Sequence, residues 1–302
     1  MSIVFEQVFV LCAFVVVGYV LTKTGIVAAE HSKILSGLLV YVFLPCNIFN
    51  TFSTNFSVTY LTANYPLLVT SLVLQAVLLT GSFFGAKLFS KHPYERRIYE
   101  YSLAVPNFGY MGYALSEGLL GSAGLIDFMI FALPVNVYTY TMGYARLTKR
   151  SMNLKGLLNP VMIATALGIL AGITGYRPPA IFMDVVDKAR GCMGPVSMLL
   201  AGIVMAQFPV KQILGNWKIY PVIALRLLII PGLVGLSLLG LNKPDILRIA
   251  VLFYALPCGM NTVVFPKLVD ENCHIGAGMG MISTLLACGT IPLVFHLFGI
   301  GL

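Results

Sequence analysis

Charge is scarce in this sequence. Charged residues make up 10% of its 302 residues, whereas soluble globular domains carry about 25%. Hydrophobic residues make up 58%, and the mean hydropathy is +0.90. A chain of this size cannot hide so much apolar surface from water by folding alone. The composition therefore excludes a soluble domain and predicts an all-α polytopic membrane protein.

Features of nucleic-acid-binding and secreted proteins are also missing. No basic run is interleaved with aromatic residues as a nucleic-acid groove requires, so we interpret the net charge of +8 in relation to the membrane. Residues 1–19 lack a positive n-region and contain Glu6, and no small-residue cleavage site follows. We expect the first apolar run to be retained as a helix.

Metal-binding and catalytic patterns are absent as well. The six cysteines show no metal-ligand spacing, and five lie in apolar segments, where cysteine behaves as a small hydrophobic residue. We therefore expect no metal site and no structural disulfide. The apolar segments contain no nucleophile–base pair at mid-depth, so we expect no enzyme, no catalytic residues and no cofactor.

Ten apolar segments are long enough to form spanning helices, which need about 20 residues. Short connections join them, and no long loop or low-complexity segment interrupts the series. The expected helices are 3–22, 34–53, 63–86, 98–118, 125–145, 156–175, 191–209, 219–240, 246–267 and 279–300.

Lysine and arginine indicate the orientation, because cytoplasmic connections are enriched in both. The connections after the first, third and fifth expected helices contain all the Lys and Arg residues of the first-half connections, and those after the second and fourth contain none. The second half follows the same trend more weakly. We therefore expect a multi-pass plasma (cell inner) membrane protein with both termini on the outer side.

Prolines recur at nearly constant offsets, which indicates an internal repeat. Because each half would contain five helices, the second half enters the membrane from the opposite side. Two inverted five-helix repeats, 1–150 and 151–302, would be related by a pseudo-two-fold axis in the membrane plane. Chance coincidence is the alternative, since prolines are common in membrane helices. The pairs are Pro45 with Pro195, Pro66 with Pro221, Pro106 with Pro257, and Pro134 with Pro292.

Two of these prolines lie at mid-span in the fourth and ninth expected helices. Pro106 and Pro257 each remove a backbone donor and clash with the preceding turn, so we expect both helices to break. Inside hydrocarbon, the freed backbone groups are tolerated only where protein or a water-filled cavity satisfies them. Matching breaks in two halves are typical of a transporter's binding site.

The order of short motifs along the chain resembles the auxin efflux carrier family, which includes plant auxin exporters and bacterial malonate and malate carriers. The motifs are Phe43-Leu44-Pro45-Cys46-Asn47, Val105-Pro106-Asn107-Phe108-Gly109-Tyr110-Met111-Gly112, Leu158-Asn159-Pro160, Gly194-Pro195-Val196-Ser197, Leu256-Pro257 with Met260-Asn261, and Thr290-Ile291-Pro292-Leu293.

This resemblance implies several properties. The fold would be the inverted-repeat fold of bile-acid sodium symporters, with the fourth and ninth helices interrupted and crossing near the midplane. The first, second, sixth and seventh helices would form a scaffold that is often a homodimer interface. The third to fifth and eighth to tenth helices would form a moving transport domain. The short connection 146–155 lacks the long loop of large plant exporters and fits a bacterial member better.

Candidate substrate-binding residues gather around the two expected breaks. Asn107 and Asn261 follow Pro106 and Pro257, and their amides can donate to a carboxylate without the cost of a buried charge. Half-helix N-termini are partly positive and suit an anion. Tyr110 and Thr262 add hydroxyl donors. The alternative is that these side chains only satisfy the broken backbone.

Four further candidates lie farther along the sequence from the two expected breaks. Arg226 is the basic residue placed well inside an expected helix, where charges mark function by default. It would attract the anion or pair with a carboxylate, or else extend to the inner interface. Asn47, Asn136 and Tyr138 would line the substrate path or serve as structural caps.

Acidic residues are few, and Glu6, Glu100, Glu117 and Asp127 all lie near expected helix ends. No carboxylate is evident at the mid-depth that a proton or sodium site needs. Sodium could still be held by amide and hydroxyl oxygens. We therefore expect a secondary transporter that moves a small organic anion, a carboxylate or auxin-like acid, by elevator-like alternating access. The alternatives are a sodium- or proton-coupled organic-anion symporter of the same fold and, less directly, a channel or a sensor.

Overall fold

The computed structural model describes residues 2–150, 158–209, 215–267, 269 and 271–300. These residues form helices and no strand, which confirms the predicted all-α class. Four π-helical segments interrupt or extend the helices: η2 (Leu39–Phe43), η3 (Phe108–Gly112), η4 (Thr139–Gly143) and η6 (Leu225–Ile229). The α-helices are α1 (Ser2–Lys23), α2 (Ser32–Leu38), α3 (Leu44–Asn55), α4 (Val58–Phe89), α5 (Pro93–Ala104), α6 (Tyr113–Tyr138), α7 (Tyr144–Thr148), α8 (Pro160–Thr174), α9 (Ala180–Ala206), α11 (Ile219–Ala224), α12 (Ile230–Leu239), α13 (Pro244–Ala255), α14 (Asn261–Lys267) and α15 (His274–Leu297).

Seven helical segments of the described chain are long and apolar enough to cross a membrane. One of them, Phe108–Thr148, continues through Gly121, where a φ of 66° bends the helix. It therefore contains the end of one expected helix and all of the next. The apolar helix α8 is shorter than the seven. The chain is thus polytopic, and the count of ten spanning helices stays a prediction.

The expected start of the seventh helix is wrong. We predicted residues 191–209, whereas α9 begins at Ala180. Its first turns contain charged residues that we had assigned to a connection. Arg190 forms ion pairs with Glu117 at 3.1 Å and Asp187 at 3.3 Å. These partners keep the charged turns helical beyond the apolar stretch.

Helix starts follow ordinary capping chemistry. The Ser57 hydroxyl accepts from the Tyr60 N–H at 3.0 Å at the start of α4. The Asn159 side chain accepts from the Met162 N–H at 3.0 Å before α8, with Pro160 at the first helical position. Both arrangements satisfy N–H groups that have no partner within the helix.

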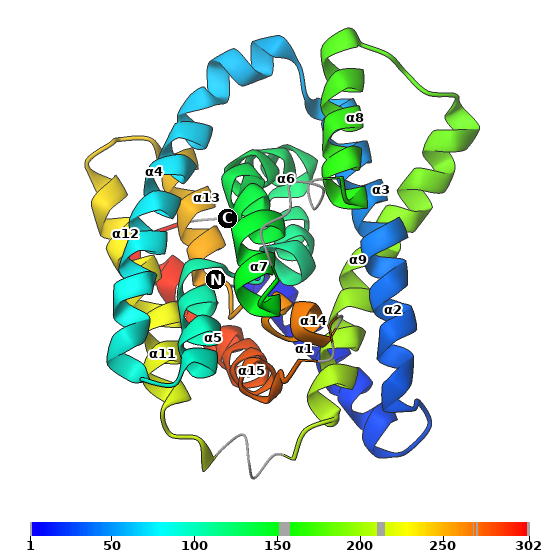
Figure 1. The fold of residues 1–302 in the computed structure, drawn as a ribbon. Coiled ribbons are helices and arrows are strands. Elements are labelled where there is room, and N and C mark those ends of the chain that lie inside the picture. The colour runs from blue at the N-terminus through cyan, green and yellow to red at the C-terminus, as the bar shows by residue number, and fades with distance from the viewer. Residues whose placement is uncertain (1, 151–157, 210–214, 268, 270, 301–302) are drawn as a thin grey trace.

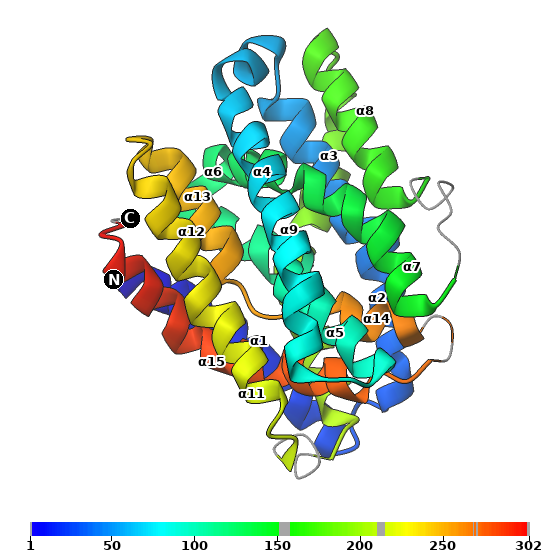
Figure 2. The same cartoon turned by 60° about the vertical axis from the view of Figure 1, so that its left-hand side comes forward.

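The helices pack in two groups on either side of α6 and α7 (Figure 1). One group contains α2, α3, α8 and α9, and α3 packs against both α8 and α9. The other contains α4, α5, α11, α12 and α13, with α4 against α5 and α12 against α13 (Figure 2). Helix α1 lies along α9. A Cβ at Gly202 would lie 2.0 Å from the Val15 carbonyl oxygen, so this contact requires glycine.

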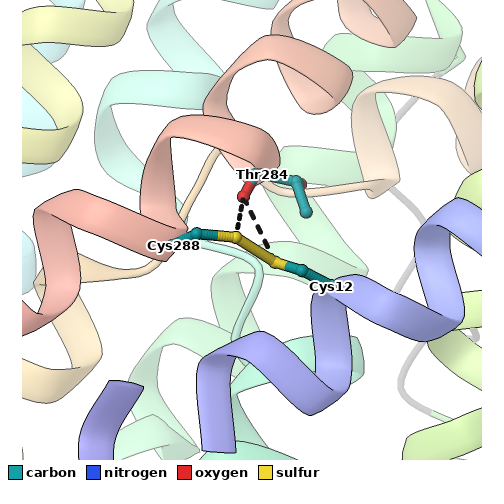
Figure 3. Close-up of a disulfide and its surroundings, with 3 residues drawn as sticks. All are labelled: Cys12, Thr284 and Cys288. Atoms are coloured by element: carbon teal, nitrogen blue, oxygen red, sulfur yellow. Dashed lines mark hydrogen bonds between the residues drawn. A yellow bond between two sulfur atoms is a disulfide. The ribbon is translucent and has the colours of Figure 1, made fainter. Parts of the chain in front are cut away.

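A disulfide joins the first and last helices. Cys12 on α1 is bonded to Cys288 on α15, beside the carbonyl oxygen of Thr284 (Figure 3). Our expectation of no structural disulfide is therefore wrong for this pair. The sequence gives no sign of it, because 276 positions separate residues that meet only when α15 packs against α1.

Candidate functional site

Both predicted helix breaks are confirmed. Helix α5 ends at Ala104 and helical backbone resumes at Phe108, while α13 ends at Ala255 and α14 begins at Asn261. Proline alone does not cause these breaks, because prolines inside α4, α6, α9 and α15 leave those helices continuous. The surroundings of Pro106 and Pro257 must therefore provide hydrogen-bond partners for the free backbone groups at the breaks.

Each of the two breaks provides hydrogen-bond partners for the other. Pro106 and Cys258 form an isolated antiparallel bridge, and the Asn107 N–H donates to the Pro257 carbonyl at 2.9 Å. In a continuous helix this N–H would return to the Leu103 carbonyl. Its diversion to the other break leaves the Leu103 carbonyl in need of another donor.

Gly259 permits the close backbone approach at this crossing. A Cβ there would lie 3.1 Å from the Val105 carbonyl oxygen and 3.2 Å from that of Pro106. The next helix completes the pairing, because the Cys258 N–H donates to the Ser283 hydroxyl of α15 at 3.0 Å. The crossing is therefore a packed backbone junction held by three segments.

Arg226 lies at the C-terminal ends of both broken helices. Its Nε donates to the Leu256 carbonyl at 3.2 Å and its Nη1 to the Leu103 carbonyl at 3.1 Å. Its side chain is fully buried, and its guanidinium carbon lies 5.8 Å from the centre of the Tyr254 ring. Of the two alternatives for Arg226, the structure does not support extension to the membrane interface, because the partly negative helix ends offer the guanidinium partners inside the protein.

Asn107 presents a buried amide with no partner. The residue is 2% exposed, and neither its Oδ1 nor its Nδ2 has a hydrogen-bond partner in the described part of the chain. A buried polar group left unpaired costs about 1–3 kcal/mol, and native proteins rarely retain one without a reason. An amide with two free donors suits a carboxylate.

Asn261 is oriented by a residue that our sequence analysis missed. Its Nδ2 donates to the Tyr101 hydroxyl at 3.0 Å, and that hydroxyl donates to Thr139 Oγ1 at 3.4 Å. Tyr138 stacks on the Tyr101 ring, with centroids 6.4 Å apart. No sequence signal pairs Tyr101 with a residue 160 positions away. The Thr262 hydroxyl donates instead to the Gly259 carbonyl at 2.9 Å.

The remaining candidates have partners on several helices. Asn136 donates to the Tyr113 hydroxyl at 3.1 Å. The Tyr110 backbone carbonyl accepts from the Ser197 hydroxyl of α9 at 2.9 Å. Asn47 donates to the Met193 sulfur at 2.9 Å, so its hydrogen bond joins α3 to α9 and not to the crossing. Its Oδ1 has no partner among the described residues.

Two acidic side chains that we considered for an ion site already have partners in the structure. Glu100 pairs with Arg146, and Asp127 accepts from the Tyr60 hydroxyl. The described residues contain no group of three or more His, Cys, Asp or Glu side chains that could hold a metal ion. The groups free to bind a ligand at the junction are therefore amides, hydroxyls and one guanidinium.

Comparison with known proteins identifies the family. The family model described as "Membrane transport protein" matches residues 3–155 and 145–295, which include both helix breaks. The chain belongs to this family. It is the auxin efflux carrier family that the motifs resemble, and the chain is therefore a transmembrane transport protein.

Several curated relatives are similar over much of this membrane transport protein. A Rhizobium meliloti protein named "Putative malonate transporter" is 24% identical, and the alignment covers 66% of each chain. An uncharacterized transporter of Methanocaldococcus jannaschii is 23% identical over 95% of this chain and 96% of its own. One from Methanothermobacter thermautotrophicus has the same identity and coverage.

Proposed function

We propose that this membrane transport protein is a secondary carrier that holds a small organic anion at the crossing of its broken helices. The observation that carries the proposal is the buried, unpartnered amide of Asn107 beside the Asn107–Pro257 hydrogen bond. A carboxylate that accepts from this amide would satisfy donors that the protein leaves free. Because the amide is neutral, the empty site does not contain a buried, unpaired charge at this position after the ligand leaves.

The local charge favours an anion. The N–H groups at the start of η3, which continues into α6, provide a partly positive helix end next to Asn107. The guanidinium of Arg226 is fully buried, and its Nη2 has no partner in the described residues. A buried positive charge without a carboxylate partner raises the potential at the junction and attracts a negative ligand.

We assign the candidate residues different roles. Asn107 is the principal contact, and Asn261, Thr262 and Tyr110 complete the site around it. Pro106 and Pro257 create the breaks that expose the binding groups. Asn47, Asn136 and Tyr138 line the path, and Arg226 supplies the charge.

Transport requires this site to open. Asn107, Thr262 and Pro257 are all buried, so the described conformation closes the junction to solvent. We infer an elevator-like movement of a transport domain, built from expected helices three to five and eight to ten, past a scaffold of the first, second, sixth and seventh. The two packed groups of helices in Figure 1 support this division.

The proposed assembly follows the same division. We infer two inverted repeats, 1–150 and 151–302, in the cell inner membrane with both termini outside. We infer a homodimer through the scaffold, whose helices α3, α8 and α9 line an apolar groove of about 650 Å³. Its lining includes Phe49, Leu167, Leu170 and Phe182.

The first experiment identifies the substrate class. Purified protein is screened by thermal unfolding against malonate, malate, monocarboxylates and auxin-like acids, since a bound ligand stabilises by mass action. We expect a concentration-dependent rise in Tm with at least one carboxylate. If none of these anions stabilises the protein or moves into proteoliposomes, the proposal is wrong.

The rival mechanism is a sodium- or proton-coupled symporter of the same fold. Glu100 and Asp127 are paired with other groups, and a symporter would need a further site for its ion. Proteoliposome uptake with and without an ion gradient separates the two, because gradient-independent flux excludes obligatory symport. Turnover far above carrier rates would indicate a channel.

A further inference from the structure

The ends of two broken helices form a cation site in this protein. Helix α5 presents the Leu103 carbonyl and α13 is followed by the Leu256 carbonyl, and both face the same guanidinium at 3.1–3.2 Å. Neither carbonyl has a helical donor, because the Asn107 N–H is diverted to Pro257 and Leu256 lies just beyond α13 in an extended conformation. In transporters with broken helices, such carbonyls bind the coupling cation.

We propose that Arg226 is a tethered cation that occupies this carbonyl site permanently, so that the carrier binds its anion without a soluble coupling cation. The anion in this inference rests on the proposed function. The cation rests on the two hydrogen bonds of Arg226. No carboxylate of the described chain pairs with Arg226. Its charge is therefore balanced only by carbonyl dipoles, as that of a bound sodium ion would be.

The position of Arg226 supports a resident role. It lies in the π segment η6, between α11 and α12, and π segments commonly mark functional sites. The extra residue of a π turn directs its side chain toward the two helix ends. Tyr254 packs beside the guanidinium, and its hydroxyl donates to Gln75 Oε1 at 3.4 Å. The site is thus closed around one cation.

Removing the guanidinium should turn the site into one for a free cation. We expect the Arg226→Ala variant to have two unsatisfied carbonyls and to unfold at lower temperature than wild type. Millimolar guanidinium or sodium should restore part of the lost Tm and flux, whereas choline, which is too large and donates no N–H, should not. Arg226→Lys should retain flux, because it keeps the charge. Arg248 is a partly buried arginine paired with Asp245, so Arg248→Gln is the matched control and should respond to no cation.

The test begins with the wild-type protein, so it does not depend on whether a variant folds. Thermal unfolding with a stabilising carboxylate is measured in sodium, potassium and choline chloride at constant ionic strength. We expect equal carboxylate affinity in all three, whereas a coupling ion typically changes affinity roughly tenfold or more. Such a dependence in wild type would overturn the proposal, as would Arg226→Ala protein that folds and transports like wild type without added cation.

The unfolding of Arg226→Ala in guanidinium, sodium and choline is measured without any carboxylate. Rescue of its Tm by guanidinium supports the tethered cation even if no carboxylate binds, in which case only the anion-carrier function fails. If carboxylates bind wild type but neither small cation stabilises the folded Arg226→Ala protein, the tethered-cation inference fails and the carrier function stands.

Discussion

The backbone N–H of Asn107 donates to the carbonyl oxygen of Pro257 at 2.9 Å, so each broken helix completes the hydrogen bonding of the other. This relationship explains how an apolar environment tolerates two interrupted helices, since freed backbone groups must find partners inside the protein. It also fixes the Asn107 side chain at the junction. The proposed site therefore follows from the way the free backbone groups at the two breaks find hydrogen-bond partners.

Close packing at the crossing makes Gly259 a sensitive position. In Gly259→Ala, the new methyl group would lie 3.1–3.2 Å from two carbonyl oxygens. We expect this overpacking to lower stability by about 1–3 kcal/mol. Gly109→Ala is the matched control, because a Cβ there meets nothing within 4 Å. Thermal unfolding of both variants checks the prediction, and equal Tm values would contradict the crossing geometry.

Tyr101 should act as a positioning residue for Asn261. In Tyr101→Phe, the Asn261 amide loses the acceptor at 3.0 Å and its orientation is no longer fixed. We expect a stability loss of about 1 kcal/mol, and a larger relative effect on KM for the anion than on maximal flux.

Tyr113→Phe provides the comparison for Tyr101→Phe. It also removes a hydroxyl that accepts from an asparagine amide, Asn136, at 3.1 Å, but we assign Asn136 to the path and not to the anion contact. We expect a similar stability loss and a smaller change in KM. A KM that changes equally in both variants would show that Tyr101 has no special role at the site.

The Cys12–Cys288 disulfide should restrain transport. It joins α1, which we assign to the scaffold, to α15, which we assign to the transport domain. Because an elevator movement displaces these helices relative to each other, we expect reductant to increase wild-type flux several-fold. The Cys288→Ser variant should show the higher flux without reductant, and it should be less stable by about 2–4 kcal/mol.

Exposed Cys192 is a free thiol, so Cys192→Ser should retain the reductant response and serves as the control. Reduction is verified by thiol alkylation in each sample. Wild-type flux that stays unchanged after complete reduction would argue against relative movement of α1 and α15.

The sequence predicts the breaks well and their partners poorly. Pro106 and Pro257 stand out because proline in an apolar segment has a definite backbone consequence. Tyr101 does not, since a tyrosine on an amphipathic stretch is ordinary until the fold brings Asn261 to it. The depth of Arg226 was ambiguous for a related reason: its partners are backbone carbonyls, which every sequence contains.

Segment ends show a second limit of sequence analysis. Helix α9 begins at Ala180, eleven residues before the expected start (191 − 180), because ion pairs such as Arg190–Glu117 support a charged helical extension. Hydropathy detects where apolar residues begin and not where a helix begins. The disulfide of Cys12 is likewise invisible, because it depends on which helices become neighbours.

The most direct test of the central claim is uptake of radiolabelled malonate, or of whichever carboxylate stabilises the protein, by proteoliposomes containing Asn107→Ala. The control is Asn64→Ala, whose amide donates within its own helix to the Tyr60 carbonyl at 3.1 Å. We predict saturable uptake by wild type and Asn64→Ala, and uptake weakened at least about tenfold in correctly inserted Asn107→Ala, as loss of a charge-assisted hydrogen bond implies. Wild-type uptake and affinity in Asn107→Ala would contradict a substrate site at the crossing.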